Sequence, residues 1–114
     1  MIFRDKTVIV TGGSKGIGAA TARLFAEAGA NLVLVARDKK ELERVADELR
    51  DRTQVAIFPM DVADDDACVD VFKKAAYEFG GVHILVNNAG CHARGNVADV
   101  DVDDLARMVD VNLR

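Results

Sequence analysis

The stretch Thr11-Gly12-Gly13-Ser14-Lys15-Gly16-Ile17-Gly18 decides the fold of this chain. It follows Lys6–Thr11, whose β-branched residues and terminal glycine pair predict a buried strand. A helical pattern comes next and ends at Gly29, and its expected inner face is Ile17, Ala20, Thr21, Leu24, Phe25 and Ala28. A glycine turn between a strand and a helix lets an anion approach the backbone, and the first N–H groups of the helix are donors. We therefore predict a phosphate or pyrophosphate site here, with a turn that binds nothing as the alternative.

This glycine loop is not the mononucleotide loop that ends in Gly-Lys-Ser/Thr. Ala19 follows Gly18 at the position where that motif requires lysine. A phosphate site of a different kind is therefore expected.

Strand-length and helix-length patterns alternate along the rest of the chain. Further strands are predicted at 32–36, 55–58 and 82–86, and the helices between them begin near Asp38 and near Asp64. The inner face of the helix after Asp38, with Glu41 in a capping box, is Leu42, Val45, Ala46 and Leu49. The inner face of the helix after Asp64 is Ala67, Cys68, Val71, Phe72, Ala75 and Phe79. A last helix is expected from the carboxylates at 101–104 through Asn112 to the end of the sequence.

This alternation predicts an α/β fold, a Rossmann-like doubly wound parallel sheet in the order 3-2-1-4, truncated after about four strands. The 114 residues suffice for one domain, residues 1–114. Ending at the fourth strand would leave Ile84, Leu85 and Val86 on an uncovered sheet edge.

Charge and composition narrow the function classes. The net charge is -4, with +2 in residues 1–60 and -6 in residues 61–114, so an anion site belongs in the first half and nucleic-acid binding is not expected. No apolar run is long enough to span a membrane, and Arg4, Asp5 and Lys6 interrupt any secretory peptide, so we expect a cytoplasmic protein. Neither the acidic run 61–70 nor the two histidines has metal-ligand spacing.

Four motifs resemble those of the short-chain dehydrogenase/reductase family, in the same order along the whole chain. They are the glycine loop, Asp61 after the third strand, Asn87-Asn88-Ala89-Gly90 after the fourth, and Val111-Asn112-Leu113 near the end. The resemblance implies a nicotinamide dinucleotide as cofactor. It places the backbone of Gly12, Gly16, Ile17 and Gly18 around the pyrophosphate and adenosine ribose. It also implies that Asp61 and Val62 flank the adenine, and that Asn88, Ala89 and Gly90 lie beside the ribose and nicotinamide. Asn87 or Asn88 would tie neighbouring strands together through its side-chain amide.

The residues after the second strand indicate which dinucleotide is bound. NAD-selective sites have a carboxylate at the end of this strand, roughly 20 residues past the glycines, where this chain has Ala36 and then Arg37. Asp38 comes two residues late and is better placed to cap a helix. Lys15 and Arg37 would meet a 2′-phosphate at ~1–2 kcal/mol each, with the Ser14 hydroxyl as a further donor. This predicts NADP(H), preferred over NAD by about thirty-fold to several hundred-fold, unless both cations are simply solvated.

The resemblance also implies a catalytic set that is incomplete here. The family's catalytic tetrad consists of an asparagine, a serine, and a tyrosine that stands four residues before a lysine. Only the asparagine has a counterpart here, Asn112. The sole serine is Ser14 of the glycine loop, and the sole tyrosine, Tyr77, has Gly81 at the lysine position. We therefore expect the cofactor-binding half of a longer reductase that acts on a carbonyl or alcohol and forms homo-oligomers. The alternatives are a stand-alone dinucleotide-binding module without catalysis, or a structural fragment.

Overall fold

The computed structural model describes residues 2–61, 63–87 and 109–112. Strands and helices alternate along the chain, in the order β1 (Thr7–Thr11), α1 (Gly16–Glu27), β2 (Asn31–Ala36), α2 (Lys39–Leu49), β3 (Val55–Pro59), α3 (Asp65–Phe79), β4 (Ile84–Asn87) and β5 (Val109–Asn112). All strand pairs are parallel, and the sheet order is β3-β2-β1-β4-β5. The predicted α/β class and the 3-2-1-4 order of the first four strands are confirmed.

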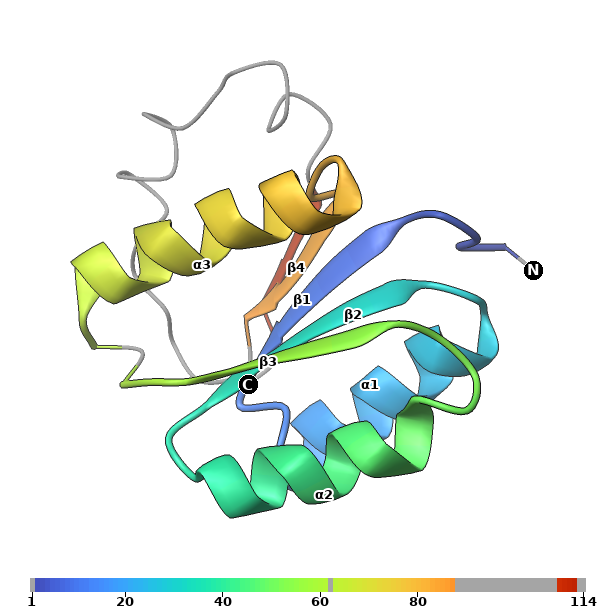
Figure 1. Cartoon of the computed structure of the whole chain (residues 1–114), viewed down its shortest axis with the longest axis horizontal. Coiled ribbons are helices and arrows are strands. Elements are labelled where there is room, and N and C mark those ends of the chain that lie inside the picture. Colours follow the sequence, from blue (N-terminus) through green and yellow to red (C-terminus); the bar gives the residue numbers. More distant parts are fainter. Residues whose placement is uncertain (1, 62, 88–108, 113–114) are drawn as a thin grey trace.

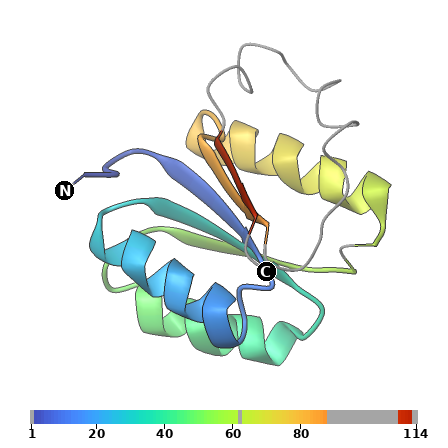
Figure 2. The ribbon, with the colours of Figure 1, turned by 180° about the vertical axis from the view of Figure 1, so that it is seen from behind.

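The sheet lies between two helical layers (Figures 1 and 2), and each layer packs on it through an apolar cluster. Helices α1 and α2 cover one face, where Val8, Val10, Leu32, Leu34 and Leu42 belong to one buried cluster. Helix α3 covers the other face, where Ile9, Val33, Val35 and Phe72 belong to a second cluster. Successive residues of β1 and β2 thus alternate between the clusters. Both strands are buried except at Asn31, which is half-buried, as expected for the centre of a parallel sheet covered by helices.

Helix α1 is rotated relative to the face that the sequence predicted. Ile17 and Leu24, assigned to the core, are 57% and 67% exposed, whereas Ala19, Ala22 and Ala26 are buried. The alanine face allows the helix axis to approach β1 and β2 closely, since the distance between packed elements depends on the side chains at the contact. The inner face of α1 is therefore formed by its smallest residues, whereas the predicted stripe followed its largest ones.

The other two helices follow the predicted pattern. Leu42, Val45, Ala46 and Leu49 of α2 are all buried. Cys68, Val71, Phe72 and Ala75 of α3 are buried too, and Phe79 packs against the same cluster. Within the described residues, no helix is both long and apolar enough to cross a membrane.

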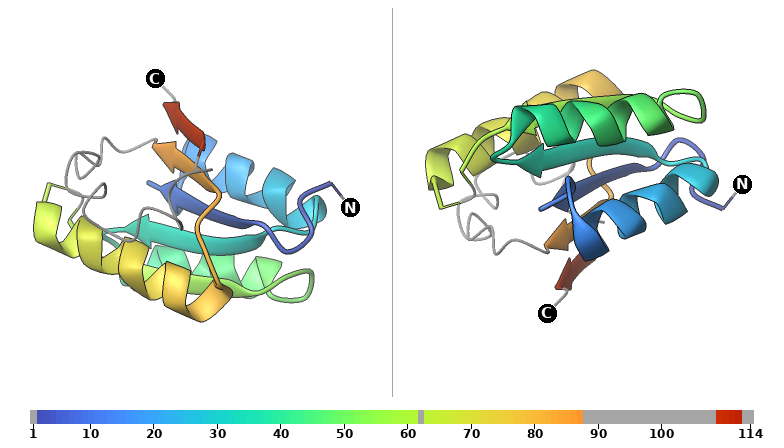
Figure 3. Two further views of the ribbon diagram at one scale, coloured as in Figure 1. Left: turned by 90° about the horizontal axis from the view of Figure 1, so that it is seen from above. Right: turned by 90° about the horizontal axis from the view of Figure 1, so that it is seen from below.

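The end of the described chain corrects one prediction. Residues 109–112, expected inside a helix, form β5, which pairs with β4 in the register Ile84↔Val109 to Asn87↔Asn112. The helix start predicted at 101–104 lies outside the described residues. Two physical reasons favour a strand: valine alternates with polar residues over 109–112, and β4 would otherwise present an unpaired edge. The edge that we expected to be uncovered is therefore paired with β5, which stands beyond β4 in Figure 3.

Candidate functional site

The glycine loop is fastened to the end of β2. The Gly12 N–H donates to the Val35 carbonyl oxygen at 2.7 Å, and the Gly13 N–H reaches the same oxygen at 3.3 Å. The loop that joins β1 to α1 therefore lies beside the carboxyl end of β2. The accepting residue, Val35, comes two residues before Arg37. The carboxyl edge of a doubly wound sheet is where such folds bind their ligands. The structure therefore brings the glycine loop and the Arg37 segment together at the predicted edge.

The N-terminus of α1 is open to an anion. Its N-cap residue, Lys15, makes no side-chain capping hydrogen bond, and the first turn contains no acidic residue. In α2, by contrast, the Asp38 carboxylate accepts from the Glu41 N–H at 3.2 Å. In α3 the Asp64 carboxylate accepts from the Ala67 N–H at 3.1 Å. The first N–H groups of a helix have no intrahelical partner and attract negative charge. Helix α1 thus keeps free the donors that the other two helices satisfy with their own side chains.

The space above this N-terminus fits a phosphate group. Gly16, the first residue of α1, has φ +54°, and a Cβ built on it would have no neighbour within 4 Å. A backbone without a side chain, facing open space at a helix start, suits close approach by a phosphate oxygen. The residues present therefore fit a pyrophosphate.

A polar contact joins β1 and β4 at the same edge. The Thr11 hydroxyl lies 3.2 Å from Asn87 Oδ1 and 3.4 Å from the Val86 carbonyl oxygen. The predicted tie through an asparagine side chain is confirmed for Asn87. The contact of Asn87 with Thr11 was not predicted from the sequence, although a polar residue at the end of a strand with an apolar centre is a usable signal for such a contact. The hydrogen bond fixes the strand end from which the glycine loop departs.

The two cations predicted for a 2′-phosphate are available for an anion. Lys15 and Arg37 are exposed, and neither takes part in an ion pair between described residues. The Asp38 carboxylate beside them is used as a helix cap, as predicted. Glu41 does not close the expected capping box with its side chain, because its carboxylate binds Arg44 at 3.0 Å. Ser14 is only 6% exposed, so it lies more deeply in the loop than the two cations.

The remaining predicted residues fall in two groups. The Asp61 carboxylate is exposed in the turn after β3, where one oxygen accepts from the Ala63 N–H at 2.9 Å. Asn112 is the last residue of β5, in register with Asn87, which places it at the carboxyl edge beside the strand that ends at Asn87. Val62 and the segment 88–90, predicted to flank the adenine, ribose and nicotinamide, lie outside the described residues.

A parallel sheet with an open glycine loop at its switch point defines a dinucleotide-binding α/β protein. The profile of the family described as short chain dehydrogenase matches residues 6–114. The chain belongs to that family, and the fold and family predicted from the sequence are both confirmed.

Known proteins similar to this chain are oxidoreductases. An uncharacterized oxidoreductase of Staphylococcus aureus (strain USA300) is 37% identical over 113 residues, covering 99% of this chain and 48% of the relative. L-Sorbose reductase from Gluconobacter frateurii, solved with NADPH and L-sorbose, has a TM-score of 0.72 at 42% identity, over 79% of this chain and 35% of its own. A short-chain dehydrogenase/reductase from Burkholderia phymatum, solved with NAD, has a TM-score of 0.74 at 35% identity. The match covers 79% of this chain and 32% of that protein. The chain thus spans about half the length of the curated relative.

Proposed function

We propose that this chain is the cofactor-binding part of an NADP(H)-dependent oxidoreductase that transfers a hydride between the nicotinamide and a carbonyl or alcohol substrate. The observation that carries the proposal is the combination at one sheet edge of an uncapped helix N-terminus with Lys15 and Arg37, neither of which has a carboxylate partner among the described residues. Two anionic groups, a pyrophosphate and a 2′-phosphate, match these two features.

Each predicted residue has a distinct task in this proposal. The backbone of Gly12, Gly16, Ile17 and Gly18 would hold the pyrophosphate, and Lys15 and Arg37 the 2′-phosphate, with Ser14 as a further donor. Asp61 and Val62 would flank the adenine, and Asn88, Ala89 and Gly90 the ribose and nicotinamide. Asn112 is proposed as the catalytic asparagine of the family. The bound dinucleotide supplies the hydride, and the chain supplies binding and orientation.

The choice of NADP over NAD depends on the end of β2. The related structures include one with NADPH and one with NAD, so membership of the family leaves this choice open. A carboxylate there would accept from the 2′-hydroxyl of NAD, but Ala36 fills the position. The next carboxylate, Asp38, already accepts from the Glu41 N–H. The Arg37 guanidinium, which has no carboxylate partner among the described residues, favours the extra phosphate of NADP by charge-assisted hydrogen bonds.

A pair of binding constants tests the cofactor assignment. We expect the chain to bind NADPH at least about thirty-fold more tightly than NADH, and the Arg37→Asp variant to lose most of this preference, because a carboxylate repels the 2′-phosphate. Arg50→Asp makes the same charge change beyond the other end of α2 and should keep the preference. Dissociation constants from NAD(P)H fluorescence measure both. An Arg37→Asp variant with an unchanged preference would exclude this site for the 2′-phosphate.

Turnover is not expected from these 114 residues alone. Ser14 belongs to the glycine loop, and Tyr77 is 93% exposed on the outer surface of α3, so neither is placed to act on a substrate oxygen. We expect NADPH binding without NADPH oxidation when carbonyl compounds are added, and activity in a full-length reductase that contains this region. We further propose a cytoplasmic location and a homo-oligomeric full-length form, with no nucleic-acid or membrane partner.

A further inference from the structure

The outer face of α3 carries a straight stripe of polar side chains, Asp66, Asp70, Lys73 and Tyr77. They follow the spacing i, i+4, i+7 and i+11, which places them on one side of a helix. All of them are exposed, and Tyr77 is 93% exposed, which is unusual for a large aromatic ring. The residues of α3 that pack in the apolar cluster lie on the opposite side of the helix. The stripe therefore faces away from the sheet.

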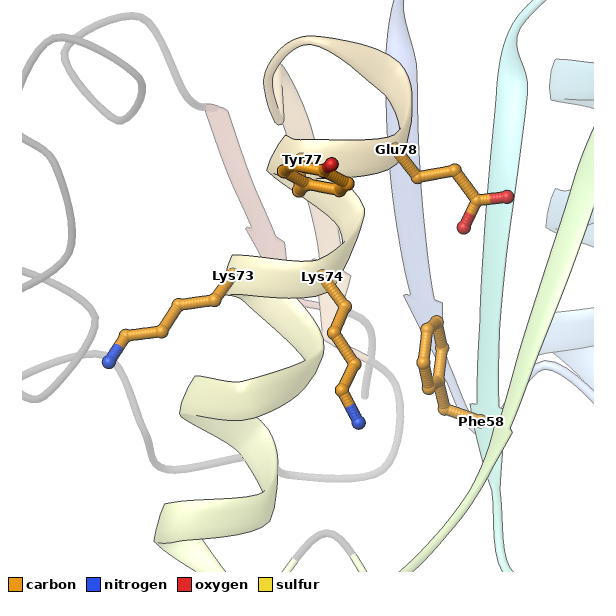
Figure 4. A pocket seen from close by; sticks show the side chains of 5 residues that line it. All are labelled: Phe58, Lys73, Lys74, Tyr77 and Glu78. Atoms are coloured by element: carbon orange, nitrogen blue, oxygen red, sulfur yellow. The ribbon is translucent and has the colours of Figure 1, made fainter.

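The two lysines of α3 point to different sides of the helix (Figure 4). The Lys74 side chain extends toward Phe58 of β3, with Nζ 6.0 Å from the ring centroid, and Glu78 points toward the strands. Lys73 points away from them, so it is the lysine that belongs to the outer stripe. Lys73 and Tyr77 also help to line a hollow of about 770 Å³ beside Phe58. A helix packed on the stripe would therefore cover part of this hollow.

The charges of the stripe are not used within the described part of the chain. Asp66, Asp70 and Lys73 take part in none of the ion pairs between described residues. Helix α2 differs, because its exposed charges pair with neighbours three or four residues away, as Lys39 does with Glu43. Asp70 and Lys73 have the same three-residue spacing without forming such a pair. The charged groups of the stripe are therefore available to a partner.

The order of the residues along the stripe suits a second copy of the same helix. When two α3 helices lie antiparallel about a two-fold axis through the middle of the stripe, Asp70 of each copy is opposite Lys73 of the other. At both ends of the stripe, Asp66 is opposite Tyr77, whose hydroxyl can donate to the carboxylate. The two Asp66 carboxylates are then about 16 Å apart along the helix axes, farther than the Debye length of ~8–10 Å. The stripe is therefore complementary to itself.

We propose that the outer face of α3 is a self-association surface, on which a second copy of this chain packs its own α3 in the antiparallel direction. In assigning a surface to the homo-oligomer, the inference rests on the homo-oligomeric form proposed above. It does not depend on the cofactor, because α1 and α2, whose N-termini adjoin the glycine loop and Arg37, cover the other face of the sheet. A uniformly acidic or basic partner fits less well, because it would meet a like charge within the stripe.

Charge reversal at the centre of the stripe tests the pairing. In sedimentation equilibrium from micromolar to millimolar concentration, the 114-residue chain should form a reversible dimer. Asp70→Lys and Lys73→Asp each bring like charges together, so each should raise the dimer dissociation constant at least about ten-fold. The combined variant Asp70→Lys/Lys73→Asp places opposite charges together again in reversed order. It should dimerise within about three-fold of the parent chain.

A mixture of the two single variants gives a stricter test. Chains with Asp70→Lys and chains with Lys73→Asp repel copies of themselves but are complementary to each other, so equal amounts should form the mixed dimer. Asp51→Lys and Lys40→Asp are the matched controls. They make the same charge changes at exposed positions in α2 and the turn after it, and should dimerise within about two-fold of the parent chain.

The proposal is overturned if the parent chain stays monomeric at millimolar concentration, if neither charge reversal weakens the dimer, or if the mixed single variants do not associate. NADPH titration of the same variants separates this result from the cofactor assignment, since each should bind NADPH as the parent chain does. A parent chain that dimerises through the stripe but does not bind NADPH would contradict the proposed function alone.

Discussion

Alanine substitutions at three glycines are expected to distinguish effects on stability from effects on the proposed binding of NADPH. A Cβ at Gly13 would lie 3.2 Å from Leu34 Cδ2 and 3.2 Å from the Val10 carbonyl oxygen. The oxygen belongs to the backbone of β1 and cannot rotate away, so Gly13→Ala overpacks the junction between loop and sheet. Overpacking of this kind costs ~1–3 kcal/mol. At roughly 4 °C per kcal/mol for a domain of this size, the Tm should fall by about 4–12 °C.

Gly16→Ala should affect NADPH binding more than it affects stability. The new methyl group meets no atom within 4 Å, so its cost to stability is limited to placing alanine at φ +54°, ~1–2 kcal/mol. The same methyl group enters the open space where the backbone is expected to meet the pyrophosphate. We expect the dissociation constant for NADPH to rise at least about ten-fold.

Gly80→Ala is the matched control. Gly80 ends α3 with φ +81° and also has open space at its Cβ position, so the strain is similar, but it lies at the other end of β4 from the glycine loop. Thermal unfolding should show a loss of ~1–3 kcal/mol at Gly13 and of ~1–2 kcal/mol at both Gly16 and Gly80. NADPH titration should show a large loss of binding at Gly16 and none at Gly80. If Gly16→Ala and Gly80→Ala bind NADPH within two-fold of each other, no phosphate approaches Gly16.

Four further substitutions test other parts of the structure. Asp38→Ala removes the α2 cap and should cost ~1 kcal/mol in urea unfolding while the NADPH preference is retained. Ala22→Leu should destabilise by ~1–3 kcal/mol, whereas Leu24→Ala, on the exposed face of α1, should change stability by less than about 0.5 kcal/mol. Burial, and next the charge of Lys6, lower the pKa of His83 below its ordinary value of 6.5, and its Nδ1 accepts from the Thr7 N–H at 3.0 Å. The unfolded chain therefore takes up a proton at this residue first as pH falls, so stability present above pH 6.5 should decline below it, and His83→Ala should flatten this slope in urea titrations from pH 7 to 5.

The sequence predicts the strand order correctly because the signals behind it are local and redundant. Each strand is a short β-branched run, and the caps at Asp38 and Asp64 mark the two helix starts that the structure confirms. The face of α1 was predicted correctly only in part: Phe25 packs against the core as expected, but Ile17 and Leu24 are exposed. The periodicity is ambiguous because the helix carries apolar residues on more than one side. Only the distance to β1 and β2 selects Ala19, Ala22 and Ala26, and a distance between elements is not encoded in one segment.

The structure of residues 109–112 also depends on more than their local sequence. Apolar residues 109 and 111 fit a strand at period two, whereas the expected helix was based on the carboxylates at 101–104, which favour a helix start. The choice depends on whether β4 has a free edge for them to pair with, which is a property of the whole sheet. For the same reason, a polar strand end such as Thr11 signals a contact, but the identity of its partner, Asn87, depends on which strands pair.

The register of the sheet explains why the predicted site residues gather at one edge. Thr11 is in register with Asn87, and Asn87 with Asn112, so the three strands β1, β4 and β5 end in a row of polar residues. The positions before Asn87 in β4 are Ile84, Leu85 and Val86, all apolar. The polar row therefore marks the line where the apolar interior stops and a ligand with polar groups is tolerated. Since the glycine loop starts directly after Thr11, the dinucleotide proposed for this chain would extend from that loop along this row toward Asn112.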